Sequence, residues 1–128
     1  MKPGMKVGLQ ETIRITVTKK MFAEFGGEIV HPAYSTAWMV YHMEWASRKI
    51  ILPYLEEEEE GMGASVSVKH TAPGRLDDEL IITATLLSHT ERSVMTEVTV
   101  NGPDGLIGIG EVKQAILPKL KIRSMLNS

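Results

Sequence analysis

The segment from Ser35 to Leu55, STAWMVYHMEWASRKIILPYL, constrains the fold more than any other part of the chain. A serine or threonine at its start can cap a helix, because its side-chain oxygen accepts a hydrogen bond from a free backbone N–H of the first turn. Pro53 is poorly tolerated inside a helix and predicts an end or a kink there. The residues between are mostly apolar, so we expect a helix to about Ile51 that is buried rather than at the surface.

Glu44 is the single carboxylate in the middle of this apolar run. Moving an ionised carboxylate from water into a core costs several kcal/mol, unless it is paired or its pKa shifts. Arg48, one turn along, could pair with it, but such a pair contributes only ~0.2–0.5 kcal/mol on an exposed helix. Glu44 is therefore either a group held there for chemistry or an ordinary residue that reaches a rim or pairs with Arg48.

The rest of the chain is rich in strand-forming residues and turn signals. Apolar and polar side chains alternate in residues 11–18, ETIRITVT, which is typical of a half-buried strand. NGPDG, from Asn101 to Gly105, predicts a hairpin turn. Gly108 and Gly110 predict a close backbone approach or a bulge within the last strand. The later strand-like segments are residues 62–70, 79–88, 93–100 and 106–117.

The segments between and beside these elements are expected to be irregular. Residues 19–34 contain a Gly-Gly pair and a proline, and predict a short helical turn followed by a loop. The five consecutive glutamates at 56–60 predict a solvated loop. Residues 1–8 and 124–128 are expected to be loose ends.

The order of strand, loop, long apolar helix and four consecutive strands predicts an α+β protein. A bent antiparallel sheet wrapped around the helix would bury it economically, and that arrangement is the hotdog fold. Residues 1–128 would form a single domain of ordinary size. One sheet edge would still need a cover, so we expect a homodimer, or a higher homo-oligomer, that joins two sheets edge to edge.

Composition excludes several classes of function. The 128 residues carry a net charge of -2, which gives no electrostatic case for a nucleic-acid partner. The absence of cysteine excludes disulfides and thiolate zinc sites. No run approaches the ~20 apolar residues that span a bilayer, so we expect no membrane partner and a cytoplasmic location. His31, His42 and His89 show no metal-ligand spacing, and no dinucleotide or phosphate-loop fingerprint predicts a cofactor.

Three further residues are candidates for a site. His70 ends the 62–70 strand on the face that carries Val66 and Val68, so it points toward the helix, either as a satisfied core residue or as an acid–base group. Thr36 and Ser35 stand at the predicted start of the helix, where one of them is an N-cap. The free N–H groups there suit a developing oxyanion.

Helix geometry separates two of these candidates. Eight helical residues rise ~12 Å, so Thr36 and Glu44 cannot touch along one straight helix. Either Thr36 lies in a loop that folds back, or the two residues meet across subunits.

With these residues in view, the chain resembles the fluoroacetyl-CoA thioesterase family of hotdog proteins. The similarity extends over roughly residues 3–118 and combines a Met-Glu-Trp-Ala element with a later His-Thr-Ala. The segments that carry it are MKVG near the start, TAWMVYHMEWA from Thr36 to Ala46, PYLE from Pro53 to Glu56, GMGA from Gly61 to Ala64, and VKHTA from Val68 to Ala72.

The resemblance implies a catalytic set of threonine, glutamate and histidine, which falls on Thr36, Glu44 and His70. It also implies that Gly63 lies near the thioester, with a backbone N–H to offer. The fluoroacetyl-specific enzyme has an aromatic lid over its acyl pocket. This chain offers Phe22 and Phe25 there, ahead of a longer loop, so the resemblance implies thioester hydrolysis more firmly than it implies a substrate.

We therefore expect an enzyme that hydrolyses a small acyl-CoA to the free acid and CoA, with Ser35 and Gly63 contacting the substrate. Glu44 would attack the carbonyl or activate water, and the sequence leaves both routes open. Two alternatives remain at this stage: a hotdog dehydratase acting on a hydroxyacyl thioester, and a non-catalytic dimer that binds acyl thioesters or lipid-like ligands.

Overall fold

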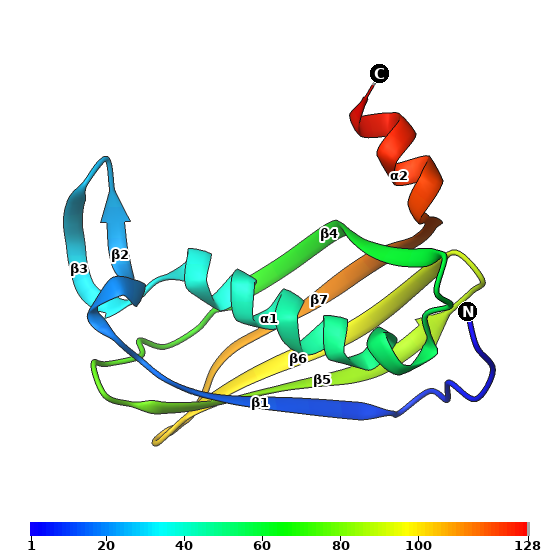
Figure 1. Ribbon diagram of the computed structural model, residues 1–128. Coiled ribbons are helices and arrows are strands. Elements are labelled where there is room, and N and C mark those ends of the chain that lie inside the picture. Colours follow the sequence, from blue (N-terminus) through cyan, green and yellow to red (C-terminus); the bar gives the residue numbers. More distant parts are fainter. Residues whose placement is uncertain (128) are drawn as a thin grey trace.

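The computed structural model describes residues 1–127, and Ser128 lies outside the described residues. A long helix is cradled by a strongly curved sheet (Figure 1). The elements in chain order are β1 Gln10–Thr16, the 3-10 turn η1 Lys19–Met21, β2 Phe22–Phe25, β3 Glu28–Tyr34, α1 Thr36–Ile51, the 3-10 turn η2 Leu52–Tyr54, β4 Glu59–His70, β5 Glu79–His89, β6 Ser93–Gly102, β7 Gly105–Pro118 and α2 Lys119–Leu126.

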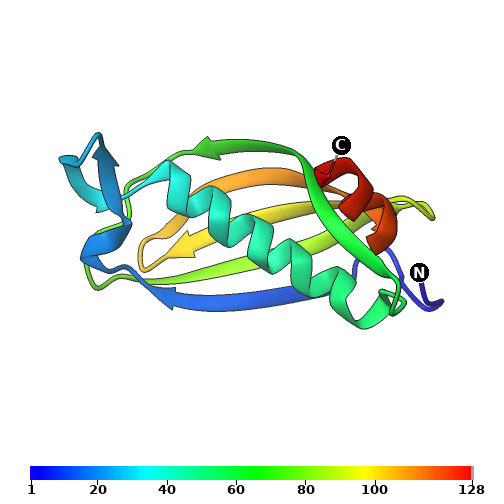
Figure 2. The same ribbon diagram turned by 45° about the horizontal axis from the view of Figure 1, so that its top comes forward.

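The main sheet has five strands in the order β1-β5-β6-β7-β4, and every pair of neighbours is antiparallel. It wraps around α1, as Figure 2 shows from a second direction. The predicted α+β hotdog fold is confirmed. β1 and β4 are the two edges of this sheet, so β4 carries an unpaired backbone edge along the site described below.

The core lies between α1 and the inner face of the sheet. Met39 and Met43 of α1 are fully buried. They pack where β7 has glycines: a Cβ at Gly108 would overlap the sulfur of Met39, and a Cβ at Gly110 would overlap the carbonyl oxygen of Ser67. The predicted close approach at both glycines is confirmed, because β7 runs against α1 on one side and β4 on the other.

Residues 22–34 form a hairpin, β2 and β3, where the sequence analysis expected a loop. The two-residue turn is Gly26-Gly27, with φ of 59° and 84°. A turn with positive φ at both central residues matches the twist of a hairpin, and glycine adopts that conformation without strain. The helical turn expected ahead of it is confirmed as η1.

Both chain ends are more ordered than expected. The amino group of Met1 lies 3.1 Å from Glu59 Oε2, and Met5 is buried in the core. Residues 119–126 form α2, so the expectation of a loose C-terminus at 124–128 was wrong for its described part. The acidic run at 56–60 is only partly a loop, because Glu59 and Glu60 begin β4. Among the described residues, no helix is long and apolar enough to cross a bilayer.

Candidate active site

The structure brings two of the predicted residues together. Thr36 is the first residue of α1 and His70 is the last residue of β4. Their side chains meet between Thr36 Oγ1 and His70 Nδ1 at 2.9 Å. The helix start and the strand end therefore build one hydrogen-bonded pair from residues 34 positions apart.

His70 is placed as an acid–base group would be. Its Nε2 atom is buried and has no hydrogen-bond partner within residues 1–127. Burial lowers the pKa of His70 below its usual value, and a hydrogen bond to the backbone of Ala72 partly opposes that shift. A neutral imidazole with one nitrogen held and the other unpartnered can accept or deliver a proton.

A hollow of about 440 Å³ lies in front of this pair. The start of α1, the end of β4 and the β2–β3 hairpin line it, including Ala23, His31, Ser35, Thr36 and His70. Ser35 is the N-cap, since its side chain accepts a hydrogen bond from the Trp38 N–H at 3.1 Å. Its hydroxyl thus fixes the end of the helix that points at the hollow.

Glu44 is exposed in the chain taken alone, so the expectation of a carboxylate buried in the core was wrong. Tyr41 and Trp45 on the same face of α1 are also exposed, at 54% and 45%. Arg48 forms its ion pair with Glu60, with a nitrogen–oxygen distance of 3.0 Å. The alternative pairing of Glu44 with Arg48 is thus not what the structure shows.

Gly63 of β4 lies directly against the Glu44 carboxylate. A Cβ built on Gly63 would be 2.8 Å from Glu44 Oε2, so no side chain fits there without moving the carboxylate. A second hollow of about 360 Å³ opens at this point and is lined by Tyr41, Glu44, Trp45, Gly63 and other residues of α1, β4 and β7. Two candidates that the sequence analysis named separately, Glu44 and Gly63, therefore lie against each other.

The two hollows share no lining residue. Thr36 is helical, so it does not lie in a loop that folds back toward Glu44. One chain therefore does not bring Thr36 and Glu44 together.

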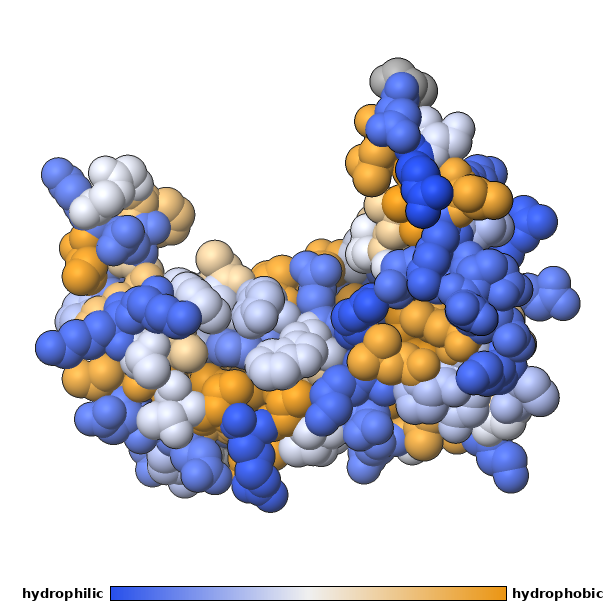
Figure 3. Space-filling view, in the orientation of Figure 1, coloured by the Kyte–Doolittle hydropathy of each residue, from blue (hydrophilic) through white to orange (hydrophobic). Residues whose placement is uncertain are grey.

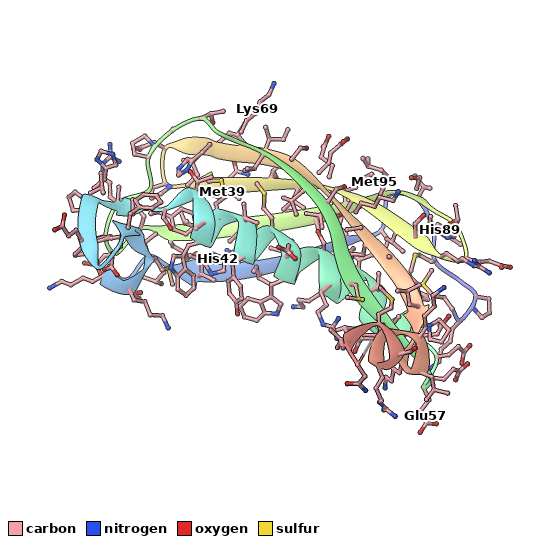
Figure 4. The ribbon with its side chains drawn as sticks, turned by 90° about the horizontal axis from the view of Figure 1, so that it is seen from above. Met39, His42, Glu57, Lys69, His89 and Met95 are labelled. Carbon is pink, nitrogen blue, oxygen red and sulfur yellow. The ribbon has the colours of Figure 1, made fainter. Side chains whose placement is uncertain are left out.

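The sequence analysis missed a buried polar pair beside His70. The hydroxyl of Tyr34 lies 2.6 Å from Nδ1 of His42, and both residues are 2% exposed. Burial lowers the pKa of His42 to about 4 and raises the pKa of Tyr34. His42 projects from α1 (Figure 4), and the Tyr34 ring meets the His70 ring edge-on at 6.2 Å between centroids.

Comparison with known proteins decides the family. Residues 17–120 match the fluoroacetyl-CoA-specific thioesterase family. The chain belongs to this family. It is 30% identical over 123 residues to the fluoroacetyl-CoA thioesterase of Streptantibioticus cattleyicolor, covering 91% of this chain and 88% of that protein. The protein is thus a thioesterase, an enzyme that hydrolyses thioesters.

Solved structures agree with this assignment. A thioesterase superfamily member from Thermus thermophilus is 38% identical, with a TM-score of 0.95 over 99% of this chain and 93% of that chain. A variant of the fluoroacetyl-CoA-specific thioesterase FlK is 26% identical, with a TM-score of 0.89 over 98% of both chains. A hotdog-like protein from Thermanaerovibrio acidaminovorans shares the fold at 18% identity and a TM-score of 0.87, covering 94% of this chain and 89% of that chain.

The two phenylalanines named as candidates for an aromatic lid are not part of the lining of the Thr36–His70 hollow. Phe22 and Phe25 do not line it, although both belong to the hairpin at its rim, and Phe25 is 73% exposed. Within residues 1–127, no three histidine, cysteine, aspartate or glutamate side chains gather as metal ligands would.

Proposed function

We propose that this thioesterase hydrolyses a small acyl-CoA with Thr36, Glu44 and His70 as its catalytic set. The observation that carries the proposal is the His70 ring, held at Nδ1 by Thr36 with a buried, unpartnered Nε2. In the tautomer with its proton on Nδ1, the Thr36 hydroxyl accepts that proton's hydrogen bond. Nε2 then offers a lone pair, which is the form that a general base needs.

The thioester carbonyl would lie near the start of α1. Backbone N–H groups there carry partial positive charge and favour the oxyanion of a tetrahedral intermediate. Ser35, as the N-cap, holds that helix end in shape. The intermediate collapses by breaking the carbon–sulfur bond, and CoA leaves as its thiolate. His70 Nε2 takes a proton from the water that enters the reaction and passes it to that thiolate.

Glu44 supplies the carboxylate of the catalytic set, either by attacking the carbonyl or by taking a proton from water. Gly63 leaves the carboxylate open on one side, because it has no side chain to cover Oε2. Attack by Glu44 would form an anhydride that water then opens. Activation of water would form the acid without a covalent enzyme intermediate, and both routes end in free acid and CoA.

The proposed site is completed by a second copy of the chain. Thr36 and Glu44 are separated by eight residues of one helix, ~12 Å of rise, so one chain does not bring them together. The exposed Tyr41 and Trp45 flank β4, an edge strand with free backbone groups. Joining β4 to β4 across a two-fold axis would cover both features and bring Glu44 of one copy toward His70 of the other.

The acyl group is proposed to be small, since the 30% identical relative is named for fluoroacetyl-CoA. We do not extend fluorine selectivity to this chain, because Phe22 and Phe25 lie outside the lining of the hollow. The cytoplasm is the proposed location, as expected from the sequence.

Mixed dimers test the shared site directly. Glu44→Gln and His70→Ala chains, each with a different affinity tag, are co-expressed, and the doubly tagged dimer is assayed for thiol release from acetyl-CoA and longer acyl-CoA esters. Each parent dimer should lose ~10²–10⁴-fold in turnover. The mixed dimer has one intact site if the site is shared, so it should recover about half of the wild-type turnover.

Three results would contradict the proposal. A mixed dimer as inactive as its parents would place Glu44 and His70 of one chain in the same site. A wild-type protein that hydrates an enoyl thioester without releasing thiol would be a dehydratase. Binding of acyl-CoA with no turnover would leave only a binding module.

A further inference from the structure

Two arms stand clear of the body at opposite ends of α1 (Figure 1). One is the β2–β3 hairpin, and the other is α2. A hollowed surface separates them in Figure 3. Their reach is similar, because eight helical residues span ~12 Å and the four residues of β2 span ~13 Å.

Both arms expose apolar side chains that nothing in one chain covers. Phe25, Ile29 and Val30 of the hairpin are 73%, 57% and 53% exposed. Leu120 and Leu126 of α2 are 73% and 75% exposed. Large apolar side chains gathered on a projecting arm mark a contact surface more often than an isolated exposed leucine does.

The arms also carry opposite charge. The hairpin has Glu24 and Glu28 and no lysine or arginine, and both glutamates are exposed. In α2, Lys119, Lys121 and Arg123 are exposed, with no acidic residue in the helix. Opposite charge around apolar centres is the arrangement that complementary interfaces use.

Strand register shows where a second copy would bring these arms. Glu59, the first residue of β4, pairs with Pro118, so α2 leaves the sheet at that end of β4. His70, the last residue of β4, shares a hollow with Ala23 and His31 of the hairpin, so the hairpin lies at the other end. Two β4 strands joined across a two-fold axis run antiparallel, which places the start of one beside the end of the other.

We propose that α2 of one copy docks on the β2–β3 hairpin of the other copy and helps to wall the Thr36–His70 hollow. This inference rests on the dimer of the proposed function. Leu120 and Leu126 would pack on Phe25, Ile29 and Val30, while Lys121 and Arg123 face Glu24 and Glu28. Because Ala23 and His31 line the hollow, a hairpin held by the partner's helix would hold that wall in place.

Cross-linking tests the contact without background, because the chain has no cysteine. One copy carries Ile29→Cys and the other Leu120→Cys, with different tags, and a short bismaleimide is added to the mixed dimer. The control pairs Ile29→Cys with Leu106→Cys, which is 46% exposed at the end of β7 opposite α2. We expect the first pair to cross-link at least about tenfold faster than the control.

Charge reversal is a second, independent experiment on the same contact. Glu24→Lys with Glu28→Lys should raise the dimer dissociation constant about tenfold, and so should Lys121→Glu with Arg123→Glu. All four changes in one chain should restore it, since each copy supplies both arms. A stable dimer whose cross-linking equals the control, with no rescue, would overturn this contact and leave the shared site standing. A monomer in sedimentation would overturn both.

Discussion

The two halves of the candidate site differ in how far one chain builds them. Thr36 and His70 are joined at 2.9 Å, and the Tyr34 ring packs edge-on against His70. Glu44 is exposed and has no hydrogen bond or ion pair within residues 1–127, although Gly63 stands against it. One half is preorganised by the fold of the monomer, and the other presents its carboxylate outward.

That difference indicates what each half needs. A carboxylate acts efficiently when its surroundings hold it and exclude water, and one chain gives Glu44 neither. The exposed Tyr41 and Trp45 beside it would become buried in the proposed dimer, so the same contact would assemble the site and desolvate it. We therefore expect turnover per chain to increase as the fraction of dimer increases.

The largest expected effect separates the halves by their role in stability. Glu44→Gln should lower turnover by ~10²–10⁴-fold, because an amide neither attacks nor takes a proton. The melting temperature should stay the same or rise, since Glu44 makes no bond within one chain and an amide costs less to desolvate in the dimer than a carboxylate. Glu57→Gln, on an exposed glutamate of the acidic run, is the matched control and should alter neither. A variant that melts lower yet keeps its turnover per folded molecule would give Glu44 a structural role.

The bounds predicted from the sequence for α1 and the strands lie close to those in the structure, because their hydrophobic patterns and turn signals are strong. The helix was expected to reach about Ile51, and α1 ends there, one residue before the turn that contains Pro53. The pairing of Thr36 with His70 could not come from the pattern, since it depends on how β4 crosses the start of α1. Thr36 and His70 were named as candidates from their positions, and the resemblance put them in one catalytic set with Glu44 without predicting that they touch.

The error over Glu44 has a physical origin. An apolar residue on a helix gives the same pattern whether it faces the core or a second subunit, so Trp45 and Leu52 were expected in the core. Both are exposed in this chain, at 45% and 48%. The hairpin was missed for a different reason: Gly26-Gly27 is a hairpin signal, but the strands that flank it do not alternate.

The pair of Tyr34 and His42 ties the Thr36–His70 half to the core, and its acid sensitivity should show that. Burial holds the pKa of His42 at about 4, against a usual value of 6.5. Between these values the unfolded chain binds a proton that the folded chain does not, so stability falls as pH falls through 6.5 toward 4. The loss would total about 3 kcal/mol.

A double variant isolates this contribution. Tyr34→Phe with His42→Leu removes both polar partners and keeps an apolar contact, so stability at pH 7 should change by about 1 kcal/mol or less. Between pH 7 and pH 4.5, urea unfolding should show a smaller fall in its free energy than the wild type shows. All other titratable groups are the same in both proteins, so the difference reports on the pair. Equal losses in the two proteins would contradict a buried neutral His42.

The smallest expected effect concerns the Glu44 half alone. In Gly63→Ala the new Cβ would lie 2.8 Å from Glu44 Oε2, which is too close, so the carboxylate must swing away. Stability should change little, because the end of a flexible exposed side chain moves easily. Turnover should fall about tenfold, since a displacement of this size disturbs a reacting group.

Gly102→Ala is the control, because its new Cβ would meet Leu80 and Ile107 at 3.4 and 3.6 Å, an ordinary packing distance. Both variants are compared with the wild type by kcat on acetyl-CoA and by thermal melts. If Gly63→Ala keeps full turnover, the open space beside Glu44 has no part in the reaction, and the carboxylate acts from another position in the dimer.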